Sequence, residues 1–161
     1  MINCATDHVE QTRDLAAALA AHVVDGDLVM LVGDLGAGKT AFTQGFARAL
    51  GVDGPVTSPT FTLAHRYVGR MVVNHLDAYR VEALAEAEDL ALPELLEDGV
   101  TVVEWGDNIL TVLPSERLEI RITLGEGDDD RYLDIGCLGP SWSARRHVLA
   151  TALSSWSCEP C

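Results

Sequence analysis

Lysine is nearly missing from this sequence. Ten of its 11 basic residues are arginines, and the single lysine is Lys39. Against 25 acidic residues, this leaves a formal charge of −14. Because proteins bind nucleic acid nonspecifically through Lys and Arg side chains that neutralise phosphates, the shortage of positive charge argues against a protein that binds nucleic acid on its own.

Long apolar runs are also missing. The longest uncharged apolar stretch, residues 15–24, is too short to cross a bilayer. The segment before it carries Asp7, Glu10 and Asp14, where an export signal has basic residues. We therefore expect no membrane association and no secretory signal, and we expect a cytoplasmic protein.

Cysteine is scarce, with four residues in a chain of 161. Cys158 and Cys161 have the spacing of a metal clip or redox pair, but the sequence has no second such pair and no nearby histidine pair. We expect reduced thiols in a frayed tail at residues 155–161. The rest, residues 1–154, is long enough for one domain with its own core.

Apolar periodicity predicts alternating helices and strands. The predicted helices cover residues 7–24, 39–50, 82–98 and 141–153, the third broken near Pro93 and the last capped by Ser141 or Ser143. The predicted strands cover residues 28–32, 61–67, 71–77, 101–105, 117–124 and 131–137. The last two form an antiparallel pair. The sequence therefore predicts a single α/β domain with a mixed, mostly parallel sheet flanked by helices.

A glycine-rich segment lies between the first predicted strand and the second predicted helix. Residues 33–40 read GDLGAGKT and fit the pattern G-x-x-x-x-G-K-[ST] in full. The glycines allow backbone N–H groups to surround a polyphosphate, Lys39 reaches the β- and γ-phosphates, and Thr40 offers a hydroxyl to Mg²⁺. Guanine-specific P-loop proteins carry an [NT]-K-x-D motif, which needs a second lysine, so we predict ATP.

Two acidic residues end predicted strands. P-loop enzymes place an acid at such a position to hold Mg²⁺ or its water, and Asp77 and Glu104 are the candidates. Their spacing does not rank them. At residues 58–60, SPT suits either a β-turn or a segment that senses the γ-phosphate. Trp105 suits the core, a lid or a docking anchor, and His75 favours a structural hydrogen bond over catalysis.

Taken together, five segments resemble the TsaE family, also called YjeE. They are residues 33–40 (GDLGAGKT), 58–63 (SPTFTL), 75–80 (HLDAYR), 104–105 (EW) and 113–114 (LP). The resemblance covers residues 9–134. Proteins of this family are small bacterial P-loop ATPases of tRNA threonylcarbamoyladenosine biosynthesis.

The resemblance implies a function for the whole chain. Such proteins hydrolyse ATP weakly alone and act with the TsaB–TsaD complex, which transfers the threonylcarbamoyl group to adenosine 37 of tRNAs that read ANN codons. Turnover of ATP resets that complex between cycles. This chain would then reach tRNA only through its protein partners.

The resemblance also implies roles for single residues. The catalytic set is Lys39, Asp77, Glu104 and Thr60, with Asp77 as a Walker-B-like acid and Thr60 as a switch residue. The nucleotide-binding set is Leu35, Gly36, Ala37, Gly38, Lys39, Thr40, Arg131 and Trp105, and the metal-linked set is Thr40 and Glu104.

Two other functions use the same motifs. One is a nucleotide-dependent assembly module, in which binding of ATP suffices without hydrolysis. The other is a small-molecule kinase, although such kinases generally carry an Arg-rich lid near the acceptor, and residues 82–98 contain seven acids and no base. We favour the partner-activated ATPase.

Overall fold

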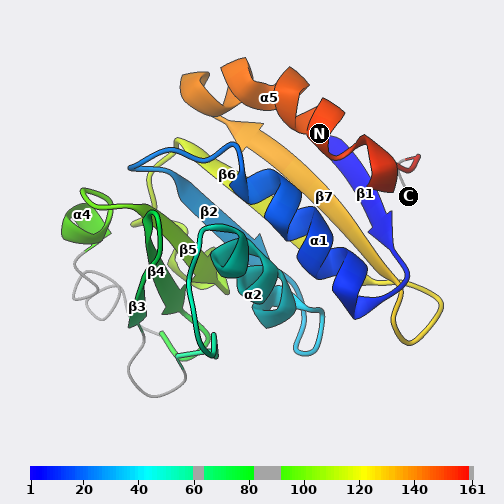
Figure 1. The fold of residues 1–161 in the computed structure, drawn as a ribbon, viewed down its shortest axis with the longest axis horizontal. Helices are drawn as coiled ribbons and strands as arrows, with labels where there is room; N and C mark the ends of the chain where they lie inside the picture. Colours follow the sequence, from blue (N-terminus) through cyan, green and yellow to red (C-terminus); the bar gives the residue numbers. More distant parts are fainter. Residues whose placement is uncertain (60–63, 82–91, 160–161) are drawn as a thin grey trace.

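A single mixed sheet with helices on it makes up the described part of the chain (Figure 1). The computed structural model describes residues 1–59, 64–81 and 92–159. The strands are β1 (Ile2–Thr6), β2 (Leu28–Val32), β3 (Ala64–Val68), β4 (Val72–Asp77), β5 (Val100–Glu104), β6 (Arg117–Leu124) and β7 (Arg131–Leu138). The helical elements are α1 (Val9–Ala20), α2 (Lys39–Ala49), α4 (Leu92–Leu95), η1 (Gly106–Ile109), α5 (Pro140–Ala152) and η2 (Ser154–Trp156).

The sheet has a parallel centre and antiparallel edges. Its strand order is β1-β7-β6-β2-β5-β4-β3. The strands β6, β2, β5 and β4 run parallel, while β7 and β1 on one side and β3 on the other join antiparallel. This arrangement confirms the predicted α/β class, and it brings the carboxyl ends of β2, β4 and β5 to one edge of the sheet, where ligands of such sheets bind.

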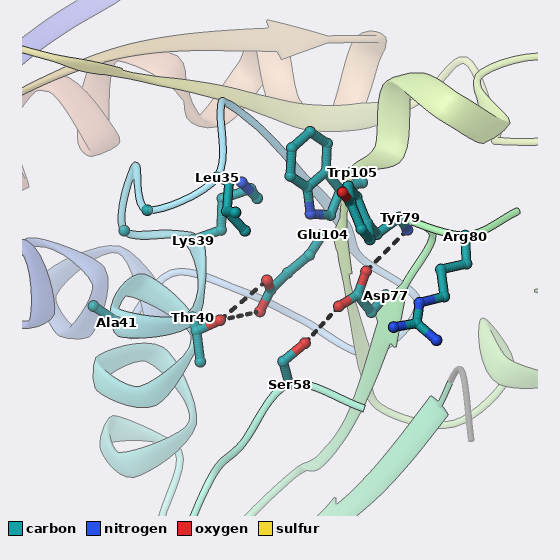
Figure 2. Close-up of a pocket in the computed structure, with 12 residues that line it drawn as sticks. Leu35, Lys39, Thr40, Ala41, Ser58, Asp77, Tyr79, Arg80, Glu104 and Trp105 are labelled. Atoms are coloured by element: carbon teal, nitrogen blue, oxygen red, sulfur yellow. Dashed lines mark hydrogen bonds between the residues drawn. The ribbon is translucent and has the colours of Figure 1, made fainter. Parts of the chain in front are cut away.

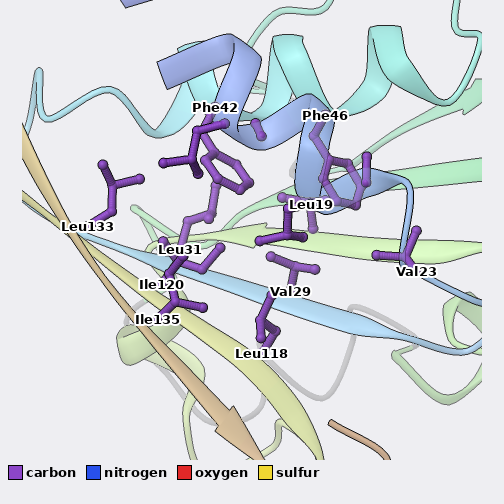
Figure 3. Packing of buried hydrophobic residues seen from close by; sticks show 14 of the residues in the cluster. Leu19, Val23, Val29, Leu31, Phe42, Phe46, Leu118, Ile120, Leu133 and Ile135 are labelled. Carbon is purple, nitrogen blue, oxygen red and sulfur yellow. The ribbon is translucent and has the colours of Figure 1, made fainter. Parts of the chain in front are cut away.

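The main core lies between the sheet and α1, α2 and α5. Figure 3 shows Phe42 and Phe46 of α2 above Val29 and Leu31 of β2. The two phenyl rings stack with centroids 6.2 Å apart. Each such side chain contributes about 1.5–3 kcal/mol when fully buried, so this layer fixes α2, and with it the loop before α2, onto the sheet.

A second core covers the opposite face of the parallel strands. Leu28, Met30 and Val32 point to this side, where Ile109 of η1 and Leu92 of α4 cover them. Strand β2 is thus buried on both faces, which is why residues 28–32 form a continuous apolar run.

Helices form at the predicted positions, but some of them begin or end at other residues than predicted. The first helix was predicted over residues 7–24 and covers only Val9–Ala20. After the helix ends, the Val24 N–H donates a hydrogen bond to the Asp27 carboxylate (2.8 Å), which stabilises a turn there. The predicted cap of the last helix is wrong: Gly139 is the N-cap of α5, and in its first turn the Ser141 N–H donates to the Glu116 carboxylate (2.7 Å). Within the described residues, no helix has the length and apolarity needed to cross a bilayer.

Two parts of the prediction fall partly outside the described residues. These are residues 61–63 of the strand predicted over residues 61–67, and residues 82–91 of the helix predicted over residues 82–98. Pro93, predicted to break that helix, lies in α4 as its second residue, a position where a proline is tolerated because it lies in the first turn.

Strand β1 was not predicted. It pairs with β7, more than a hundred residues away, from Ile2↔Ile135 to Thr6↔Arg131. The C-terminal segment then joins β1, because the Cys158 N–H donates to the Asn3 carbonyl (3.1 Å) and Ser157 forms a bridge with Cys4. The predicted boundary between residues 154 and 155 stays a prediction.

The thiol of Cys4 makes stability depend on pH. Burial, and after it the neighbouring Cys158 and Asp134, raise the pKa of Cys4 from 9.0 to about 11. The unfolded chain therefore loses this proton at lower pH than the folded chain, and the free energy of unfolding should fall between pH 9 and 11 by up to about 1.4 kcal/mol per pH unit.

Denaturant titrations of the reduced protein from pH 8 to 11 measure this fall. We expect Cys4→Ala to have a shallower slope than the unmodified chain. Part of the slope should stay, since burial also raises the pKa of Cys137. Equal slopes in the two proteins would contradict the assignment to Cys4.

Candidate functional site

The glycine-rich loop joins β2 to α2, as the sequence predicts. A Cβ on Gly33 would lie 2.4 Å from the Ile122 carbonyl oxygen of β6, so this position has no room for a side chain. Gly38, the N-cap of α2, has φ +108°, a conformation that other residues rarely adopt. The loop therefore needs both glycines to turn its backbone toward the first residue of α2.

Lys39, that first residue, is 5% exposed and points back over the loop. Its Nζ donates hydrogen bonds to the carbonyl oxygens of Gly33 (2.6 Å) and Asp34 (2.8 Å), and it lies 3.9 Å from the centroid of the Trp105 ring. Burial lowers the pKa of Lys39, while nearby carboxylates, Glu104 first among them, oppose this shift. The result is a cation enclosed by the loop and one aromatic ring.

A cavity of about 370 Å³ opens beside this lysine (Figure 2). Its lining comes from the loop, the start of α2, the ends of β4 and β5, and the segments around them. The residues are Leu35, Gly36, Gly38, Lys39, Thr40, Ala41, Ser58, Asp77, Tyr79, Arg80, Glu104 and Trp105. The structure thus brings most of the predicted site residues to one cavity.

Thr40 and Glu104 meet in this cavity. The Thr40 hydroxyl lies 3.2 Å from each oxygen of the Glu104 carboxylate, and Glu104 is 2% exposed. A hydroxyl and a carboxylate are hard oxygen donors of the kind that Mg²⁺ prefers. Among the described residues, no group of three or more His, Cys, Asp and Glu side chains could hold a metal. These donors therefore fit a cation that takes its other ligands from phosphate and water, as Mg²⁺ usually does.

Asp77 lies beside Glu104, because the two are register partners on β4 and β5. Asp77 accepts hydrogen bonds from the Ser58 hydroxyl (2.5 Å) and the Tyr79 N–H (2.9 Å). The two acids thus have different partners: Glu104 contacts the first turn of α2, and Asp77 contacts the segment at residue 58. Spacing in the sequence could not separate them.

Trp105 directly follows Glu104 and has a left-handed backbone, with φ +57°. Its ring lies between Lys39 and Tyr79, whose ring centroid is 4.9 Å away. Trp105 both lines the cavity and packs against the second core, so its role stays a prediction.

Arg131, predicted to contact the nucleotide, binds the loop itself. Its guanidinium donates to the carbonyl oxygens of Ala37 (2.9 Å) and Gly36 (3.3 Å), and to those of Asp128 and Asp130. Neither Arg131 nor Ala37, which is fully buried, lines the cavity in the described part of the chain. A contact of Arg131 with nucleotide stays a prediction.

Four residues that line the cavity were not among the predicted site residues: Ala41, Ser58, Tyr79 and Arg80. Thr60, the predicted switch residue, lies outside the described residues, and Ser58 of the same segment is the one seen to contact Asp77. Tyr79 received no role, although it follows Asp77 by two residues, a spacing that gives its N–H access to the carboxylate. Arg80 lines the cavity as well.

Comparisons with known proteins agree with these motifs. The family model described as "Threonylcarbamoyl adenosine biosynthesis protein TsaE" matches residues 6–133. Two proteins named tRNA threonylcarbamoyladenosine biosynthesis protein TsaE are each 45% identical to this chain. The one from Bacillus subtilis aligns over 83% of this chain and 84% of its own length, and the one from Streptomyces coelicolor over 81% and 93%. The crystal structure of YdiB from Bacillus subtilis superposes with a TM-score of 0.81 at 36% identity, over 94% of this chain and 97% of that one.

Proposed function

This chain belongs to the TsaE family of tRNA threonylcarbamoyladenosine biosynthesis proteins, and we propose that it is the Mg²⁺-dependent ATPase of that pathway. Membership makes it a nucleotide-binding P-loop protein with a role in tRNA modification. We propose that the protein acts in the cytoplasm, which is consistent with a role in tRNA modification. The proposal adds hydrolysis, the metal and the partners.

One observation carries the proposal: a phosphate-binding loop and two strand-end acids share one cavity. Lys39 and Thr40 lie on the loop side, and Asp77 and Glu104 face them from β4 and β5. A protein that only bound nucleotide would need the loop but not the two acids. Two buried carboxylates opposite it would repel phosphate, so they favour a site that holds a cation and a water as well.

The loop would bind the triphosphate through its backbone N–H groups and the N-terminus of α2. Lys39 would then exchange its two carbonyl acceptors for β- and γ-phosphate oxygens. Thr40 and Glu104 would hold Mg²⁺, directly or through its waters. When bound, Mg²⁺ would neutralise charge on the phosphates as the terminal P–O bond breaks.

We propose that Asp77 orients the attacking water. Its carboxylate is held by Ser58 and the Tyr79 N–H, which fixes its direction toward the cavity. Water attacks the γ-phosphorus in line, the bond to the bridging oxygen of ADP breaks, and inorganic phosphate leaves with the oxygen of water. The segment that contains Thr60 would help to place this water.

We propose the TsaB–TsaD complex as the partner that raises turnover, with ATP hydrolysis resetting that complex between cycles of tRNA modification. Leu35 and Tyr79, at the rim of the cavity, are 78% and 51% exposed, so a docked protein could cover the nucleotide and complete the site. The charge of −14 supports contact with tRNA through partners rather than directly.

Phosphate release tests this function. We expect slow release by the chain with ATP and Mg²⁺, faster release when TsaB–TsaD is added, and none when EDTA removes the metal. Multiple rounds of threonylcarbamoyladenosine formation should need both this chain and hydrolysable ATP. Repeated rounds with a nonhydrolysable analogue would instead support the assembly module.

A further inference from the structure

A buried histidine lies directly behind Glu104. His75 is in the middle of β4, fully buried, and its Nε2 lies 2.7 Å from the Glu104 Oε1. The contact crosses from β4 to β5, because Val102 is the register partner of His75 and Glu104 is two residues further along. The structural hydrogen bond predicted for His75 is therefore confirmed, and its partner is the acid that contacts Thr40.

That carboxylate is the only hydrogen-bond partner of the His75 ring among the described residues. The other ring nitrogen, Nδ1, is buried and has none there. An unpaired buried polar atom costs about 1–3 kcal/mol, so packing alone favours an apolar side chain at this position. The imidazole is explained by its contact with Glu104.

We propose that His75 is a positioning residue that holds the Glu104 carboxylate toward Thr40 and thereby sets the affinity of the site for its divalent cation. The Oε1 atom is shared between His75 and Thr40, while Oε2 contacts Thr40. With the hydrogen bond from His75 in place, rotation of the carboxylate away from α2 would break the contact with His75 as well as those with Thr40. The inference rests on the proposed metal site.

Binding of Mn²⁺ in place of Mg²⁺, followed by electron paramagnetic resonance on the protein with ADP, measures this affinity without turnover. We expect His75→Phe, which keeps a ring but loses the hydrogen bond, to weaken Mn²⁺ binding about 10- to 100-fold. His75→Gln, which can still donate an N–H, should recover most of the loss. Affinity for ADP without metal should change less than about twofold, since His75 does not line the cavity.

His65→Phe is the matched control. His65 is the register partner of His75 on β3 and contacts the Tyr67 hydroxyl (3.0 Å) rather than Glu104, so Mn²⁺ affinity should stay unchanged. If His75→Phe does not fold, His75→Met provides a second apolar variant that fills the same space.

The outcomes separate the two proposals. Unchanged Mn²⁺ affinity in a folded Phe or Met variant, or an equal loss in the Gln variant, would overturn the role of His75. Failure of the unmodified protein with ADP to bind Mn²⁺ would instead overturn the metal site itself. A purely structural role would lower the melting temperature of the Phe variant and leave its Mn²⁺ affinity as it was.

Discussion

Lys39→Ala is expected to slow ATP hydrolysis by about 10²- to 10³-fold, the loss that follows removal of one group aimed at developing charge. Lys39 is the only lysine of the chain, and its Nζ lies at the cavity, held by two loop carbonyls and the Trp105 ring. Alanine would leave the γ-phosphate without this cation. Phosphate release at saturating ATP, with TsaB–TsaD present, measures the loss.

Two further variants sharpen this result. Lys39→Arg keeps the charge, but a planar guanidinium is wider than an ammonium and should not restore the rate. Arg48→Ala removes an exposed cation from the same helix, outside the cavity, and should leave it unchanged. Full activity of Lys39→Ala would show that hydrolysis does not occur at this loop.

Trp142→Ala is expected to lower the free energy of unfolding by about 3–5 kcal/mol, as for other large side chains removed from a core. Trp142 of α5 is 1% exposed and belongs to the main core. The Arg145 guanidinium lies 3.9 Å from its ring centroid and forms two hydrogen bonds with Asp27 (2.6 and 2.8 Å). The substitution would therefore open a cavity where α5 joins the sheet.

Thermal unfolding should show the effect as a decrease in melting temperature of roughly 6–20 °C. Val148→Ala is the control, since Val148 lies in the same helix but is 48% exposed, and it should change stability by less than about 0.5 kcal/mol. An equally small effect of Trp142→Ala would mean that α5, which lies beyond the family match at residues 6–133, is not integral to the domain.

The elements with local signals could be predicted from the sequence. The run at residues 28–32, the glycine loop and the helix from Lys39 have continuous apolar or turn patterns, and they form as predicted. Residues 117–124 also form a strand at the predicted bounds, because their alternation is long. Strand β1 escaped prediction, since its five residues pair with segments more than a hundred residues away in the sequence.

The contacts of the site depend on register, which spacing does not provide. Asp77 and Glu104 were both candidates, but only the pairing of β4 with β5 places Glu104 against Thr40 and His75. The same limit applies to Arg131, whose position beside the loop follows from the pairing of β7 with β6. The residue types predicted a phosphate-binding loop with two acids beside it. The strand register decides that Glu104 contacts Thr40 and Asp77 contacts Ser58.

The single, buried lysine should also make the folded chain resistant to proteases that cleave only after lysine. A protease that cleaves after lysine has one site, Lys39, the first residue of α2. Lys39 is 5% exposed, and the loop before it is held by hydrogen bonds from Lys39 and Arg131. Cleavage there requires the loop or the whole domain to open. The appearance of fragments 1–39 and 40–161 therefore reports opening at the nucleotide site, and a bound ligand that closes the loop slows it.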